Sequence, residues 1–127
     1  MEILAKSSKD NQEQVIKRGA ISMENKLEDV EVVLLGEVED VLDDNVDVVI
    51  KFPQGEVRTS TFFTMKNIEG IIARYRSSGE CLAGRFFWSK DMVIVEDLRE
   101  ETIRETIHEL VRSGEYRHAF GVAKLDD

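Results

Sequence analysis

The stretch VDVVIKFPQGEVRTSTFF, residues 46–63, constrains the fold of this chain more than any other feature. It holds two runs rich in β-branched and aromatic residues, which are typical of strands. Between the runs, Pro53 fixes its own φ, and Gly55 can adopt the positive φ that a tight turn needs. Residues 46–52 and 57–63 are therefore predicted to pair as an antiparallel hairpin, which commits the chain to a β-sheet.

Residues 65–78 have the pattern of an amphipathic helix. Thr64 is a good N-cap residue, and Gly79 stands where a left-handed residue usually ends a helix. The apolar residues recur at spacings of three and four, which predicts one buried face. These residues are Ile68, Ile71, Ile72 and Tyr75.

A second helix is predicted to start near Glu100 and to stop at Gly114. Acids in its first turn complement the helix dipole, and Glu100 can pair with Arg104 one turn later. Its buried face should consist of Ile103, Ile107, Leu110 and Val111. Beyond this helix, Tyr116 and Phe120 are expected to lie against the core.

Three further strands are predicted. Residues 30–38 are rich in valine and leucine, with Gly36 marking a bulge or the end of the strand. Residues 92–97 begin with an apolar run, Met92–Val95, which favours a central strand covered on both faces. The aromatic run at residues 85–88 is expected to form a half-buried strand beside it, with Gly84 allowing a tight entry.

The predicted class is therefore α+β, a single mostly antiparallel sheet of about five strands with two main helices packed on one face. The long crossover between residues 63 and 85 permits one parallel pairing. The length, 127 residues, suits one domain spanning residues 1–127. Residues 1–20 give only a weak signal, a short polar helix ending at Gly19, and residues 121–127 are expected to be a frayed tail.

The charge of the chain is concentrated in one segment. Formal net charge is −9, and residues 24–47, the acidic segment, contain ten acids and one base. The rest of the chain is balanced, so this segment carries the whole excess. One interpretation is a solvated sheet edge whose charges oppose aggregation. The other is a surface that attracts a basic protein partner and speeds its encounter.

On the second interpretation the protein is a small cytoplasmic binding protein, and an immunity or antitoxin protein that neutralises a basic toxin is its concrete form. Negative potential disfavours nucleic acid as a partner. No apolar run approaches the roughly 20 residues of a membrane helix, so no membrane partner is expected. The predicted partner-binding residues are Glu37, Glu39, Asp40, Asp43, Asp44 and Asp47.

No metal or cofactor site is predicted. Asp43, Asn45 and Asp47 imitate the start of an EF-hand loop, but Val48 replaces its glycine and Gln54 its last glutamate. Zinc-ligand spacings and glycine-rich phosphate loops are absent from the sequence. The single thiol, Cys81, follows Glu80, which opposes thiolate formation, so a structural role is favoured over catalysis.

Two alternatives stay open. The first is an enzyme or small-molecule binder with a pocket between helices and sheet, lined by Tyr75, Cys81, Arg85 and Trp88. The second is a self-associating domain that forms a homodimer through a sheet edge or through the aromatic run.

Overall fold

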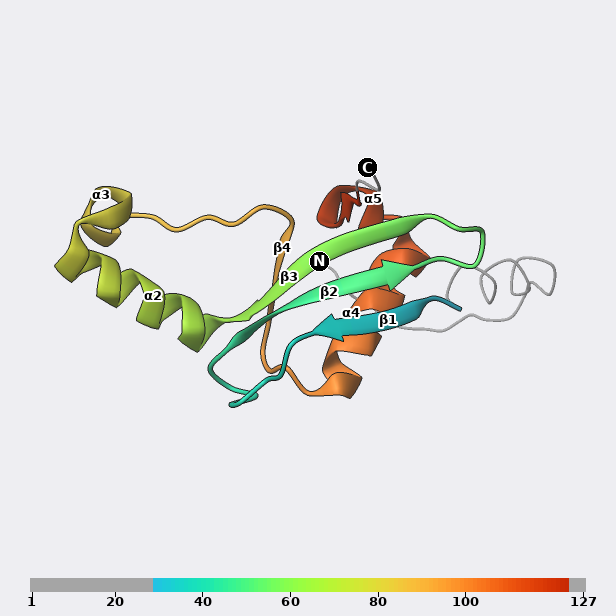
Figure 1. The fold of residues 1–127 in the computed structure, drawn as a ribbon, viewed down its shortest axis with the longest axis horizontal. Coiled ribbons are helices and arrows are strands. Elements are labelled where there is room, and N and C mark those ends of the chain that lie inside the picture. Colours follow the sequence, from blue (N-terminus) through green and yellow to red (C-terminus); the bar gives the residue numbers. More distant parts are fainter. Residues whose placement is uncertain (1–28, 124–127) are drawn as a thin grey trace, which may run out of the picture.

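The computed structural model describes residues 29–123 as an α+β unit with one five-stranded sheet (Figure 1). The strands are β1 (Glu31–Leu35), β2 (Asn45–Lys51), β3 (Val57–Thr64), β4 (Met92–Val95) and β5 (Gly121–Val122). The helices are α2 (Met65–Ser78), α3 (Glu80–Gly84), α4 (Glu100–Ser113) and α5 (Tyr116–Ala119). The predicted α+β class with a mostly antiparallel sheet is confirmed.

The sheet order is β1-β2-β3-β4, with β5 beside the first half of β3. The predicted hairpin is the β2–β3 pair, in which Val48 faces Ser60, and Gly55 takes a φ of 107° in its turn. Pairing is antiparallel throughout except between β3 and β4, the one parallel pair that the crossover allowed. β1 ends at Leu35 because Gly36, with a φ of 121°, turns the chain away.

The core lies between the sheet and α4, which Figure 1 shows behind the strands. Valine and isoleucine side chains of β2 meet the buried stripe of α4, in which Ile103 and Ile107 are fully enclosed. Tyr116 and Phe120 close the same core, as expected. The predicted Glu100–Arg104 ion pair is present at 3.0 Å.

The other main helix, α2, is not packed on this face. It continues outward from the end of β3 and projects beyond the sheet, with α3 folded back at its far end (Figure 1). Its caps are as predicted, because the Thr64 hydroxyl accepts from the amide of Asn67 and Gly79 is left-handed. The amphipathic spacing predicted the helix correctly but not the element that packs on its apolar face. That face is covered by α3 and the chain that follows it, and not by the sheet.

Two strand predictions are wrong. Residues 85–88 form no strand, because α3 reverses the chain beside α2, where no sheet edge is within reach. The fifth strand is instead β5, which belongs to the segment expected to fray. β4 is an edge strand rather than a central one, and Ile94 on its outer side is 47% exposed. The continuous apolar sequence of β4 therefore did not mean that both faces of the strand are buried.

The predicted helix at the N-terminus lies outside the described residues, as do residues 124–127. Within residues 29–123, no helix has the length and apolar character to cross a membrane.

Candidate functional site

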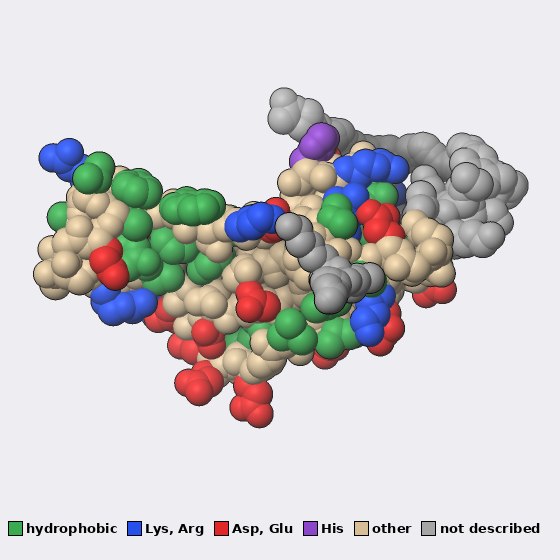
Figure 2. Space-filling model, turned by 45° about the horizontal axis from the view of Figure 1, so that its top comes forward, with side chains coloured by type: hydrophobic (Ala, Val, Ile, Leu, Met, Phe, Trp, Pro, Cys, Tyr) green, Lys and Arg blue, Asp and Glu red, His purple; other side chains and the backbone are tan. Residues whose placement is uncertain are grey.

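The acidic residues predicted to bind a partner lie together at one end of the sheet. Five of them belong to the connection between β1 and β2, residues 36–44, which we name the acidic loop. The sixth, Asp47, lies on β2. In Figure 2 acidic side chains gather along the lower edge of the molecule, where this connection lies.

Two of these carboxylates build the loop. Asp44 accepts from the amide of Glu39 at 2.9 Å and from the amide of Asn45 at 2.8 Å. Asp40 accepts from the amide of Leu42, two residues on, at 3.0 Å. These bonds satisfy backbone donors that no strand or helix would otherwise pair. The hydrogen bond from Glu39 is the main cause that lowers the pKa of Asp44 below its ordinary value.

The loop is also anchored to its neighbours. The amide of Leu98, just before α4, donates to the carbonyl of Val41 at 2.8 Å. The amide of Thr64, at the start of α2, donates to the carbonyl of Asp44 at 3.2 Å. Asn45 and Asn67 bond through their side chains at 2.8 Å. The loop is therefore fixed against both main helices, and its charges are held in one place.

The other three carboxylates of the acidic loop form no side-chain hydrogen bonds with described residues. Glu37 and Glu39 are exposed, Asp43 is half-buried, and no side-chain hydrogen bond involves these three carboxylates within residues 29–123. Asp47 accepts from the hydroxyl of Thr61 at 2.6 Å. In the same part of the chain, no lysine or arginine forms an ion pair with any of the six predicted residues. Five of the six carboxylates are gathered on the acidic loop, and no cation within residues 29–123 forms an ion pair with them.

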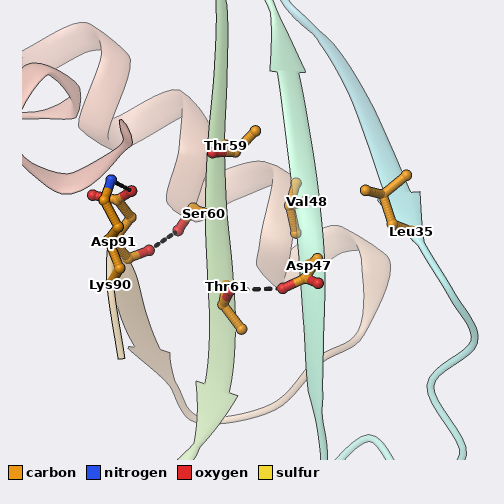
Figure 3. A pocket seen from close by; sticks show the side chains of 8 residues that line it. All are labelled: Leu35, Asp47, Val48, Thr59, Ser60, Thr61, Lys90 and Asp91. Carbon is orange, nitrogen blue, oxygen red and sulfur yellow. Dashed lines mark hydrogen bonds and ion pairs between the residues drawn. The ribbon is translucent and has the colours of Figure 1, made fainter. Parts of the chain in front are cut away.

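A shallow pocket of about 330 Å³ lies on the sheet face opposite α4 (Figure 3). Its lining mixes apolar and polar side chains, and the Asp47–Thr61 hydrogen bond lies on its floor. Lys90 and Asp91, which form an ion pair at 2.8 Å, stand at one side. Its lining residues are Leu35, Asp47, Val48, Thr59, Ser60, Thr61, Lys90 and Asp91.

None of the four residues predicted to line a pocket is among them. Tyr75 is half-buried on α2, Cys81 is half-buried on α3, and Arg85 and Trp88 are exposed on the connection that follows. They lie on the part of the chain that projects from the sheet, whereas Asp47 is the only predicted site residue in the pocket. That the four bind a small molecule stays a prediction.

The structure also separates the chain's nucleophile from its imidazoles. Cys81 lies on α3 at the far end of α2, while His108 and His118 lie on α4 and α5 (Figure 1). Across residues 29–123, no group of three or more acidic, histidine or cysteine side chains could hold a metal ion.

Sequence reasoning missed the exposure of the aromatic run. Phe87 packs edge-on against Phe63 with ring centroids 5.3 Å apart, but Phe86 and Trp88 point outward and are 45% and 69% exposed. The aromatic run was expected to be half-buried in a strand, and only Phe87 of the three rings packs on the sheet. The sequence did not show how much of Phe86 and Trp88 stays exposed, because that depends on what packs around the connection.

Comparison with known proteins finds no match. Neither a protein-family model, nor a curated protein, nor a solved structure resembles the chain closely enough to be matched. The acidic loop is the candidate functional site because of its own chemistry. It is a fixed group of carboxylates beside a projecting helix, and no described lysine or arginine forms an ion pair with it.

Proposed function

We propose that this protein is a binding protein whose acidic loop docks a basic surface on a protein partner. The observation that carries the proposal is the state of Glu37, Glu39 and Asp43, which lie together and pair with no cation of the described chain. Exposed like charges repel one another, and a surface of opposite sign relieves that repulsion on binding.

The rigidity of the loop adds to its fitness for docking. A loop that is ordered before binding loses little conformational entropy when it binds. Here Asp40 and Asp44 supply the order, and Glu37, Glu39 and Asp43 supply the free charge. The concrete form of the proposal is an inhibitor of a basic enzyme, such as an immunity or antitoxin protein.

The proposal is tested by affinity capture with three forms of the full chain. The first is the natural protein. The second, the loop variant, carries Glu37→Gln, Glu39→Gln and Asp43→Asn, which leaves the hydrogen bonds of Asp40 and Asp44 intact. The third is a control of the same net charge, with Glu96→Gln, Glu105→Gln and Glu115→Gln at three exposed positions elsewhere.

The natural protein and the control should retain the same basic protein, and the loop variant should lose it. An inhibitor should also suppress the toxicity of that partner on co-expression, and the loop variant should fail to do so. Equal retention by all three forms, or capture of an acidic partner, would refute the proposal.

A further inference from the structure

Residues 65–88, which comprise α2, α3 and the aromatic connection, form an arm that extends from the end of the sheet (Figure 1). Apolar side chains run along this arm from its tip to the sheet (Figure 2). Four large ones are exposed: Met65 at the base, Leu82 at the tip, and Phe86 and Trp88 on the connection. Exposed apolar surface on this scale marks a site of protein association, and tryptophan is a frequent anchor of such sites.

The arm has a defined shape. A Cβ at Gly84 would lie 2.7 Å from the carbonyl oxygen of Ile72, so only glycine lets the tip pack this closely on α2. At the base, the contact between Phe87 and Phe63 joins the returning connection to β3. The exposed apolar residues therefore project from an ordered element.

The tip also holds strained backbone. Cys81, Leu82 and Ala83 all have left-handed conformations, with φ between 51° and 57°. Each such residue costs about 1–2 kcal/mol relative to the right-handed form. Backbone strain of this kind is often found at functional positions. One of the three strained residues, Leu82, is 66% exposed.

The arm carries a net positive charge, opposite in sign to that of the acidic loop. It carries the four bases Lys66, Arg74, Arg76 and Arg85 and the two acids Glu69 and Glu80. None of these four bases forms an ion pair with another described residue. Arg74, Arg76 and Arg85 lie toward the tip. The acidic loop lies at the base of the arm, where Thr64 donates to the carbonyl of Asp44 and Asn67 bonds to Asn45, the first residue of β2.

This arrangement fits a second copy of the chain. The 14 residues of α2 span about 21 Å. If two arms lie side by side in opposite directions, the tip of each reaches the base of the other. The basic tip then faces the acidic loop, and Leu82 of one copy approaches the exposed apolar residues at the base of the other. A twofold axis makes both contacts at once, as in most homodimers.

We propose that the protein forms a homodimer in which the arms pack antiparallel and each basic tip docks on the acidic loop of the other copy. This inference goes beyond the proposed function, because its occupant is the chain itself. Both use the acidic loop, so a basic partner and the second copy compete for the same carboxylates.

The test is a charge exchange between two purified full-length variants. The tip variant carries Arg74→Glu and Arg85→Glu, and the reversed-loop variant carries Glu37→Lys and Glu39→Lys. All four side chains are exposed, and circular dichroism verifies folding. Sedimentation should show the natural protein at twice the 14.5 kDa chain mass and each variant as a monomer, with a dimer dissociation constant at least about tenfold larger.

An equimolar mixture of the two variants should form dimers again. In the mixed dimer, an acidic tip meets a basic loop at one contact, and the natural pair forms the other. Native mass spectrometry distinguishes this heterodimer by mass. A control with Glu96→Lys and Glu105→Lys should dimerise like the natural protein.

Trp88 provides a second readout, because it is the only tryptophan and is 69% exposed. Its emission should shift to shorter wavelength as the protein concentration rises through the dimer range, and Leu82→Ala should move that range upward. A natural protein that stays monomeric, or a mixture that stays monomeric, overturns the inference. The proposed function is tested separately by capture of a basic partner, so either can fail while the other stands.

Discussion

The carboxylates of Asp44 and Asp97 each accept hydrogen bonds from backbone amides. Asp44 closes the acidic loop, and Asp97, although buried, precedes α4 and accepts from the amide of Arg99 at 3.0 Å. The pKa of Asp97 is lowered chiefly by a hydrogen bond from the side chain of Thr102 and then by the amide of Arg99. A lowered pKa means that the ionised form is better stabilised in the folded chain than in the unfolded chain.

The stability from these two groups is therefore fully present above their unfolded pKa, near pH 4, and is lost as pH falls through their folded pKa values. Thermal unfolding should occur at lower temperature at about pH 3 than at pH 7. Asp97→Asn should unfold at a lower temperature than the natural protein at pH 7, and the gap between them should narrow as pH falls below about 4. A gap between the two that stays constant with pH would contradict the assignment, and Asp29→Asn, at an exposed position outside the elements, is the control.

At the scale of elements, α3 is the unusual piece of this chain. Gly79 and Gly84 enclose ECLA, and both glycines have positive φ, so the chain stays left-handed through most of the turn. The sequence predicted that Gly79 ends a helix and that Gly84 allows a tight turn. Three consecutive non-glycine residues in the left-handed region were not, because side chains there oppose that conformation.

The α3 geometry predicts opposite responses to glycine at two exposed alanines of the arm. Ala83→Gly removes a Cβ from a residue with a φ of 57° and should stabilise the protein by up to about 1 kcal/mol. Ala73→Gly, in the right-handed helix α2, should destabilise it by about 1 kcal/mol. Urea unfolding of dilute protein measures both, and equal losses for the two variants would mean that the tip is right-handed.

Local signals predicted the elements that local chemistry determines. The turn at Pro53 and Gly55 gave the β2–β3 hairpin, and the caps at Thr64 and Gly79 gave α2 with its observed ends. The strand predicted at residues 85–88 failed because a strand also needs a neighbouring edge, which depends on where α3 sends the chain. The exposure of Trp88 could not be predicted for the same reason, because it also depends on where α3 directs the chain.

At the scale of the whole molecule, the acidic and basic side chains are separated, and the exposed apolar residues lie on the basic arm. The fold places the carboxylates of the acidic loop at the base of an arm whose arginines lie toward its tip, and within residues 29–123 neither group forms an ion pair. The sequence predicted the acidic half of this arrangement, because the excess charge is contiguous along the chain. The basic half is dispersed along residues 65–88 and becomes a feature only when α2 and α3 fold together.

The central claim is that the acidic loop is a docking surface, and the salt dependence of association measures it most directly. With the captured basic partner, the association rate constant of the natural protein should fall steeply as salt rises, because the Debye length shrinks from about 30 Å at 0.01 M to about 10 Å at 0.1 M. The loop variant should associate about tenfold more slowly at low salt and respond weakly to salt, while the control of equal net charge keeps the natural slope. Equal slopes for all three forms would contradict the claim.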